Sequence, residues 1–310
     1  MEIRIDEDIR SFLGENAVNY AAVRQLDGDA STRAYWRVYA EGAAYVLCRD
    51  RGFIDMPETE YPFTVMYRLL RGRVPVPEII AMDNRRGLFL LQDLGDDLME
   101  YVCSRLDADG VTRLYASCVE NLFLIQAIRG ECDTPFSRAF DIEQLMFEFD
   151  FFIEHALNGY WNACLAGSDL IELRSEFLNI SKLLFRPELF VLNHRDYHSR
   201  NIILCGDIPY IIDYQDARMG LPHYDAVSLL RDSYVVLDSG VFEYLLNYYY
   251  EGSREMGIHS MSREEFNYYF DVMAFQRNVK ALGTFGNQVT VRGNARYERY
   301  IRPTAAYLGG

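Results

Sequence analysis

Residues 192–201 read Leu192-Asn193-His194-Arg195-Asp196-Tyr197-His198-Ser199-Arg200-Asn201. An aspartate and an asparagine five residues further on stand in a short loop before the apolar run 202–204. Phosphoryl-transfer enzymes use this His-x-Asp-x-x-x-x-Asn spacing to place a base and a metal ligand. The stretch therefore predicts that Asp196 receives the proton of an acceptor hydroxyl group and that Asn201 is a ligand of Mg²⁺.

A hairpin is predicted directly after this loop. Apolar residues 202–204 and 210–212 are separated by the turn sequence Gly206-Asp207-Ile208-Pro209, and Asp213 ends the second strand. An aspartate at such a place is more often a backbone cap than a metal ligand, so Asp213 alone is weak support. The order of base, asparagine, hairpin and aspartate is that of kinases, and we therefore predict Asp213 as the second Mg²⁺ ligand.

The two histidines of the loop have less specific expectations. His194 is expected to orient the loop by hydrogen bonding rather than to titrate during catalysis. His198 is expected either to brace the loop or to lie beside a phosphate group. The residues alone do not decide between these two roles for His198.

Composition indicates a globular protein with a well-buried core. The chain has 310 residues, half of them apolar or aromatic, which suits one large or two modest domains. Its net charge of −15 argues against nucleic acid and anionic membranes as partners. Acidity would also suit a cationic substrate, but we interpret it mainly as a solubility property, because no long block of like charge occurs. A small-molecule acceptor is the expected partner, and no feature points to an obligate protein partner.

The spacing of the cysteines and the first residues of the chain indicate the cellular compartment. The six cysteines form no Cys-x-x-Cys pair, which fits neither a zinc site nor a small disulfide scaffold. Residues 1–8 are charged and lack the apolar core of a signal peptide, and no later apolar run approaches membrane-spanning length. We expect the protein in the cytoplasm.

The order of predicted elements separates a strand-rich part from a helical part. A short leading helix precedes strands at 32–40 and 43–49, a helix at 57–70, strands at 76–80 and 87–92, and a hinge at 93–97. Helices are then expected at 111–127, 142–157, 170–184, 224–234, 242–250 and 264–282. Ser262 with Glu265 forms a capping-box candidate, and Asp225 is placed to cap the helix that contains Val227.

We therefore predict an α+β, bilobal, protein-kinase-like fold. Its small antiparallel-sheet lobe would bind the nucleotide and cover residues 1–94. Its larger helical lobe would cover residues 95–310 and contain the catalytic loop and the acceptor site.

With these residues in place, the chain resembles the aminoglycoside phosphotransferase superfamily over almost its whole length. Within it, the chain is most similar to the anomeric amino-sugar kinases of cell-wall recycling, which phosphorylate the C1 hydroxyl of N-acetylmuramate and N-acetylglucosamine with ATP. The motifs that carry this finer resemblance are Gly28-Asp29-Ala30-Ser31-x-Arg33-x-Tyr35-x-Arg37, Leu91-Gln92-Asp93-Leu94-Gly95, Tyr214-Gln215-Asp216-Ala217, the run 224–232 and Lys280-Ala281-Leu282-Gly283-Thr284-Phe285. Each motif is modest, but the ordered set is specific.

The resemblance implies ATP and Mg²⁺ as cofactors and assigns nucleotide contacts. The turn Asp29-Ala30-Ser31 would cover the ATP phosphates, and Gln92, Asp93 and Leu94 would pass the adenine ring. Where kinases have an ATP-contacting lysine on the second hairpin strand, strand alternation places Cys48. This departure fits the anomeric kinases and leaves open which cation steadies the phosphates, Arg33 and Arg37 being candidates.

Around the acceptor, the candidates are His198, Gln215, Asp216 and Arg231, whose polar groups suit sugar hydroxyls or a lactyl carboxylate. Arg231 would bind the carboxylate, or else form a structural salt bridge with Asp232 or Asp225. A further polar helical face, made by Gln276, Arg277 and Lys280, either reaches the cleft or faces solvent, and these three are left out of the predicted site.

The sequence thus predicts an ATP- and Mg²⁺-dependent sugar kinase, most similar to kinases acting on the anomeric hydroxyl of N-acetylmuramate or N-acetylglucosamine. An alternative is a phosphotransferase for another hydroxyl acceptor, such as an aminoglycoside, choline or an amino alcohol. A nucleotide-binding pseudoenzyme is a third possibility, which intact Asp196, Asn201 and Asp213 argue against.

Overall fold

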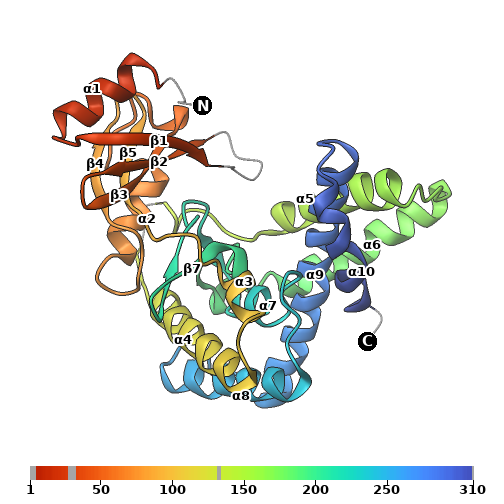
Figure 1. The fold of residues 1–310 in the computed structure, drawn as a ribbon. Coiled ribbons are helices and arrows are strands. Elements are labelled where there is room, and N and C mark those ends of the chain that lie inside the picture. Colours follow the sequence, from red (N-terminus) through yellow and green to blue (C-terminus); the bar gives the residue numbers. More distant parts are fainter. Residues whose placement is uncertain (1–4, 27–32, 131–133, 309–310) are drawn as a thin grey trace. The chain divides into compact units, whose positions relative to one another are not determined.

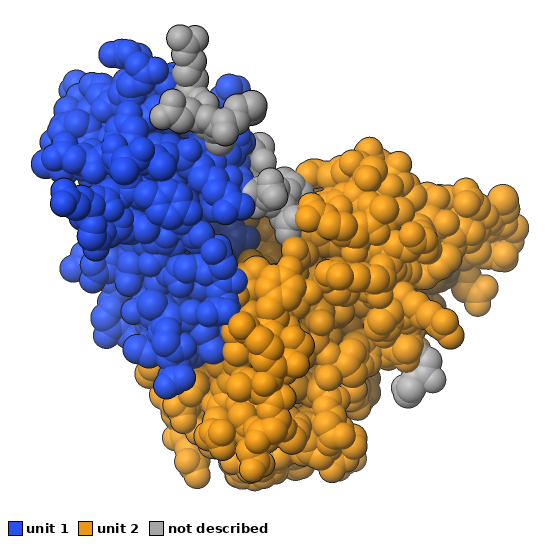
Figure 2. All heavy atoms as spheres, viewed as in Figure 1, with its two compact units in different colours: residues 1–97, 203–215 blue, residues 98–202, 216–310 orange. Residues whose placement is uncertain are grey.

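The computed structural model describes residues 5–26, 33–130 and 134–308. The chain divides into two compact units, one of residues 1–97 and 203–215 and one of residues 98–202 and 216–310 (Figure 2). The expected division into folding domains 1–94 and 95–310 stays a prediction. No helix in the described ranges is long and apolar enough to cross a membrane.

The first unit is built on a five-stranded antiparallel sheet (Figure 1). Its strand order is β1-β2-β3-β5-β4, with bounds β1 Tyr20–Leu26, β2 Ala34–Ala40, β3 Ala43–Arg49, β4 Ile79–Asp83 and β5 Leu88–Gln92. The predicted hairpin of β2 and β3 is confirmed. Ala40 lies opposite Ala43 beside the turn. The sequence prediction missed β1.

Alternation along β3 distributes its side chains between two apolar clusters. Leu47 is fully buried in a cluster that includes Phe12 from helix α1 (Glu7–Glu15). Its neighbour Cys48 points the other way, into a cluster with Phe53 and Phe89. Because successive side chains of a strand point to opposite faces, one sheet separates the two clusters.

Helix α2 (Pro62–Leu70) begins later than the predicted start at residue 57. The Glu60 N–H donates to the Pro57 carbonyl oxygen at 2.9 Å, so this segment closes a turn before the helix. Pro62 occupies the first helical turn, where a missing N–H costs nothing. The apolar spacing predicted the helix correctly. Its start was predicted five residues too early, at Pro57 instead of Pro62.

Strand β4 also begins later than expected, at Ile79 rather than Val76. Pro77 has no N–H to donate to a ladder, which explains why pairing starts beyond it. The short 3₁₀ segment η1 (Arg51–Phe53) follows β3.

The predicted hairpin after the catalytic loop is confirmed as strands β7 (Ile202–Cys205) and β8 (Ile208–Ile211). Gly206 takes a φ of +63° in its turn, a conformation that glycine adopts without strain. The hairpin is bonded into the first unit, because the Ile211 N–H donates to the Pro75 carbonyl at 2.9 Å.

The second unit is mainly helical. Strands β6 (Val191–Asn193) and β9 (Arg218–Gly220) form a short antiparallel pair in it. Its helices are α3 Met99–Cys103, α4 Ala108–Gln126, α5 Ile142–Phe152, the π-helix η2 Ile153–Tyr160, α6 Gly167–Leu184, α7 His223–Leu230, α8 Ser239–Glu255, α9 Arg263–Thr290 and α10 Glu298–Ala306, with 3₁₀ turns η3 Pro187–Leu189, η4 Ser199–Asn201 and η5 Ala295–Tyr297. The expected helices are confirmed, with shifted ends. The α+β fold class is confirmed.

Helix α9 is the longest element of this unit and contacts α5, η2, α7 and α10 (Figure 1). The Ser262 half of the predicted capping box is confirmed at the start of α9, where the Ser262 hydroxyl accepts from the Glu265 N–H at 3.2 Å. Gly286 lets η2 approach closely, since a Cβ there would lie 2.3 Å from the His155 carbonyl oxygen. The helix is thus packed firmly along its length.

Candidate active site

The loop between β6 and β7 is anchored by a carboxylate from α7. Asp225 accepts hydrogen bonds from the backbone N–H groups of His194 and Arg195, the latter at 3.0 Å. Arg195 has a φ of +85°, a strained conformation for a side-chain-bearing residue that these bonds help to maintain. The predicted helix-capping role of Asp225 is wrong, because α7 already begins at His223 and Asp225 lies inside its first turn.

A second buried carboxylate anchors the other end of the loop. Asp232 accepts from the Ser199 N–H at 3.0 Å and from the Tyr234 N–H at 2.9 Å. Burial raises the pKa of Asp232 to about 6, and these hydrogen bonds oppose that rise. Since its oxygens serve the backbone, Asp232 acts in positioning the loop.

Within the loop, Asp196 and Asn201 are bonded to each other. The Asn201 side-chain nitrogen donates to the Asp196 backbone carbonyl at 2.9 Å, so its amide oxygen is left as the acceptor. The His194 Nδ1 accepts from the Asp196 N–H at 3.3 Å, in agreement with the loop-orienting role expected for this histidine. The loop therefore presents one carboxylate and one amide oxygen, the ligand chemistry expected from the motif.

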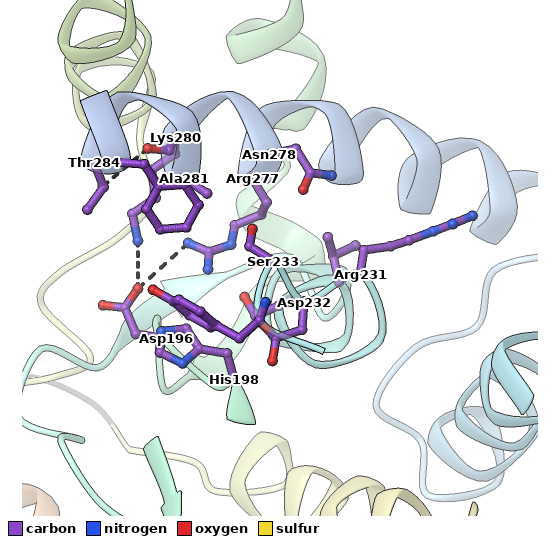
Figure 3. A pocket seen from close by; sticks show the side chains of 14 residues that line it. Asp196, His198, Arg231, Asp232, Ser233, Arg277, Asn278, Lys280, Ala281 and Thr284 are labelled. Carbon is purple, nitrogen blue, oxygen red and sulfur yellow. Dashed lines mark hydrogen bonds and ion pairs between the residues drawn. The ribbon is translucent and has the colours of Figure 1, made fainter. Parts of the chain in front are cut away.

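Two cations from α9 converge on the Asp196 carboxylate (Figure 3). Lys280 Nζ lies 2.6 Å from Asp196 Oδ1, and a terminal nitrogen of Arg277 lies 3.8 Å from the same oxygen. Burial favours a higher pKa for Asp196, but the neighbouring cations, Lys280 first, outweigh it and hold that pKa well below its usual value. Asp196 is therefore an ionised carboxylate at neutral pH.

These residues line a pocket formed by the catalytic loop, α7 and α9 (Figure 3). The lining consists of Asp196, His198, Val227, Ser228, Arg231, Asp232, Ser233, Tyr234, Arg277, Asn278, Lys280, Ala281, Thr284 and Phe285. Polar and charged side chains make up most of this lining, which suits a polar acceptor.

Two predicted acceptor residues lie in this lining. His198 packs edge-on against Tyr234, and burial lowers the pKa of its imidazole to about 3, so the ring is neutral at neutral pH. Its Nδ1 has no hydrogen-bond partner within the described residues. The Arg231 guanidinium lies over the Phe242 ring at 3.9 Å and forms no salt bridge with Asp225 or Asp232, which accept backbone N–H groups.

The other two predicted acceptor residues have partners of their own. Gln215 donates to the Asp213 carboxylate at 2.8 Å in the first unit. Asp216, in the second unit, lies 3.5 Å from Arg195 and 4.0 Å from Arg138. The Gln215 contact is exposed and the Asp216 side chain is 49% exposed, so both side chains are within reach of solvent.

Asp213, the predicted second metal ligand, follows β8 with a φ of +64°. Its side chain is 48% exposed, and one oxygen lies 3.9 Å from Arg33. Such a backbone conformation is uncommon outside glycine and clusters at functional sites. Asp213 thus stands at the end of the hairpin with an accessible carboxylate.

The predicted nucleotide contacts lie in the first unit or outside the described residues. Asp29, Ala30 and Ser31 fall in the undescribed range 27–32.

At the end of β5, the Gln92 N–H donates to the Glu78 carbonyl at 2.9 Å, and Leu94 is buried. The Asp93 carboxylate binds Arg37 at 2.7 Å, so this arginine, one of the two candidate phosphate cations, is held by acidic neighbours. Cys48, in the place of the usual lysine, is buried, and burial raises the pKa of its thiol to about 12.

The sequence profile of the phosphotransferase enzyme family matches residues 22–259. The chain belongs to this family. It is similar to the N-acetylmuramate/N-acetylglucosamine kinase of Pseudomonas putida, with 28% identity over 99% of this chain and 89% of the relative. The kinase of the same name from Pseudomonas aeruginosa is 30% identical over 92% of this chain and 82% of its own length.

Solved structures of other phosphotransferases share the fold. The ADP-bound aminoglycoside phosphotransferase APH(2'')-Ib superposes with a TM-score of 0.64 at 15% identity, covering 98% of this chain and 97% of the other. The choline kinase LicA from Streptococcus pneumoniae gives a TM-score of 0.62 at 16% identity, with 97% and 99% covered. The expected phosphotransferase fold and family are thereby confirmed.

The sequence prediction left out the two α9 residues of this phosphotransferase site. Arg277 and Lys280 do not face solvent; their side chains keep 8% and 16% of their surface exposed and both contact Asp196. Their three-residue spacing places them on one helix face, but no local motif links them to a loop about eighty residues earlier. The sequence signals were the shared helical face and, for Lys280 alone, its place in the resemblance motif 280–285.

Proposed function

We propose that this phosphotransferase uses ATP and Mg²⁺ to phosphorylate the anomeric C1 hydroxyl of N-acetylmuramate and N-acetylglucosamine. The names of its relatives and the motifs shared with the anomeric kinases support the acceptor. The observation that carries the proposal in this molecule is the ionised Asp196 in a polar pocket with two cations against it.

Asp196 would accept a hydrogen bond from the acceptor hydroxyl and take its proton as the phosphorus–oxygen bond forms. Because its pKa is low, it would orient the hydroxyl until late in the transfer rather than remove the proton beforehand. An anomeric hydroxyl suits such a base, since it is a stronger acid than an ordinary alcohol.

The charge of the pocket favours a neutral or anionic acceptor over a cationic one. Lys280 and Arg277 stand beside Asp196 in this pocket, whereas the Arg231 guanidinium points away from Asp196 and lies over the Phe242 ring (Figure 3). Choline and aminoglycosides carry positive charge, which these side chains would repel. The lactyl carboxylate of N-acetylmuramate would instead be attracted, so this acceptor is expected to have the lower KM.

The residues present fit a magnesium ion that is shared with the nucleotide. The described ranges contain no group of three histidine, cysteine or acidic side chains able to hold a metal by themselves. Mg²⁺ in kinases needs only one or two protein oxygens, because substrate phosphates and water complete its octahedron. We propose Asn201 Oδ1 of the second unit and the accessible Asp213 carboxylate of the first unit as its protein ligands; a bound ion would neutralise charge on the phosphates.

The test is ATP consumption with N-acetylmuramate, N-acetylglucosamine, an aminoglycoside and choline, followed by phosphorus NMR of the products. We expect turnover with the two amino sugars and an anomeric phosphate signal. Turnover restricted to the cationic acceptors would refute the assignment.

The variant Asp196→Asn tests the base in the same assay. It keeps the side-chain volume and removes the acceptor of the proton, so turnover should fall by about 10²-fold to 10⁴-fold. Nucleotide-induced thermal stabilisation should persist, because Asp196 is not assigned to the nucleotide. Near-normal turnover would show that another group is the base.

A further inference from the structure

Lysine is almost absent from this chain. The sequence contains 29 arginines and two lysines, Lys182 and Lys280. Lys182 is exposed in the last turn of α6. Lys280 is the residue that donates to the Asp196 carboxylate at 2.6 Å. A chain that uses arginine for nearly every cation thus has a lysine as the cation that is hydrogen-bonded to the proposed base.

We propose that Lys280 is a positioning residue for phosphoryl transfer, which holds the Asp196 carboxylate in the orientation that receives the acceptor proton. This inference rests on the proposed function of Asp196. It adds a residue from α9 to a site that the sequence motif confines to the catalytic loop and hairpin.

The geometry of the pair supports this role. The Lys280 ammonium contacts Oδ1 only, which leaves Oδ2 of Asp196 for the acceptor hydroxyl. Lys280 lies one turn before Gly283, where a Cβ would stand 2.8 Å from the Phe152 Cα, so the helix that carries it cannot shift easily. The ammonium is therefore supplied from a rigid element, as a precise site requires.

Arg277 does not duplicate this contact. One of its terminal nitrogens donates to the Tyr224 hydroxyl at 2.9 Å, and the same nitrogen lies 3.8 Å from Asp196, beyond hydrogen-bonding distance. A guanidinium is a planar fork that tends to grip both oxygens of a carboxylate. At position 280 such a fork would occupy the oxygen that the acceptor needs, whereas a compact ammonium contacts one.

The first experiment compares steady-state kinetics of the full-length variants Lys280→Met and Lys280→Arg with Lys182→Met as the matched control. We expect kcat with N-acetylglucosamine to fall about 10-fold to 1000-fold in Lys280→Met. The loss is smaller than the full contribution of a general base, because Asp196 is still present but less well oriented. The KM for ATP should change little. Lys280→Arg should not restore kcat, and Lys182→Met should behave as the wild type. A kcat within twofold of wild type for Lys280→Met would overturn the proposal.

Chemical rescue separates positioning from a purely structural role. In Lys280→Ala, n-propylammonium can enter the space of the lost side chain and donate to Asp196, so kcat should rise with its concentration. Tetramethylammonium has the same charge and no N–H, and it should not rescue. If kcat falls only in proportion to the amount of folded protein, and n-propylammonium does not restore it, Lys280 is not a positioning residue.

An NMR measurement keeps this inference distinguishable from failure of the proposed function. Protein labelled with ¹³C at lysine Cε gives one signal for each of two lysines, and Lys182→Met assigns them. The variant Asp196→Asn should move the Lys280 signal and leave that of Lys182 in place. If no acceptor is turned over but Asp196→Asn moves the Lys280 signal, the acceptor assignment fails while the Lys280–Asp196 ion pair is supported. An unmoved Lys280 signal refutes the pair itself.

Discussion

Replacing His223 by phenylalanine should remove a large part of the acid sensitivity of folding. The His223 ring is fully buried in α7 and lies 4.5 Å from the Phe266 ring, centroid to centroid. Burial, with a smaller contribution from His259, lowers the pKa of His223 from 6.5 to about 3. Phenylalanine has a similar shape and no proton to bind, so it fits a site with aromatic neighbours.

The magnitude follows from proton linkage. Between pH 3 and 6.5 the unfolded chain binds a proton at this histidine and the folded chain does not, so stability is lost as pH falls below 6.5. From pH 7.5 to pH 5.0, this one group lowers the free energy of unfolding by about 2 kcal/mol. The value hardly depends on the folded-state pKa as long as that pKa lies below 4. Other titrating groups are present in both proteins and largely cancel.

The assay is urea unfolding of wild type and His223→Phe at both pH values, under conditions where both transitions are reversible and two-state. The wild type should lose about 2 kcal/mol more than the variant between pH 7.5 and pH 5.0. If both proteins lose the same free energy, the His223 ring is either hydrated or stabilised as a cation, and the burial argument fails.

Two further variants test how the loop and the helix packing are held. In Asp225→Asn, the amide nitrogen would face one of the two loop N–H groups that the carboxylate now accepts, so stability should fall by about 1–3 kcal/mol with a lower kcat, measured by urea unfolding and the kinase assay. In Gly286→Ala, the new Cβ would lie 2.3 Å from the His155 carbonyl oxygen and should cost about 1–3 kcal/mol in urea unfolding. Gly14→Ala is the control, because no atom beyond its chain neighbours and the backbone of its own helix lies within 4 Å of the added Cβ, and no loss is expected.

The parts of the fold that sequence predicted are those whose signal is local. The β2–β3 hairpin has aromatic and β-branched strands around Glu41-Gly42, and the long helices have regular apolar spacing. Strand β1 was missed because most of its residues are exposed and lack an alternating apolar pattern. It is an edge strand, whose formation depends on pairing with β2 rather than on its own burial.

The same distinction holds for the site. Asp196 and Asn201 could be proposed from the sequence because kinase chemistry fixes the separation of such a pair in one loop. Asp225, Arg277 and Lys280 act through contacts with residues that lie 30 to 84 positions away in the chain. An aspartate near a helix start and a basic helix face each have common structural explanations. Asp225 and Lys280 belong to resemblance motifs, but those motifs do not say which residues of the loop they contact.

Net charge and site charge are independent properties of this protein. Its excess of 15 negative charges predicts attraction of cations at long range, yet the charges nearest to the proposed base are those of Lys280 and Arg277. At about 0.15 M salt, exposed charges farther than about 8 Å are largely screened, whereas partly buried neighbours are not. We therefore expect the immediate cations, rather than the net charge, to select the acceptor beside Asp196. In the proposed mechanism, a few side chains on one helix face would select the charge of the acceptor, while Asp196 and the proposed metal ligands would serve any acceptor.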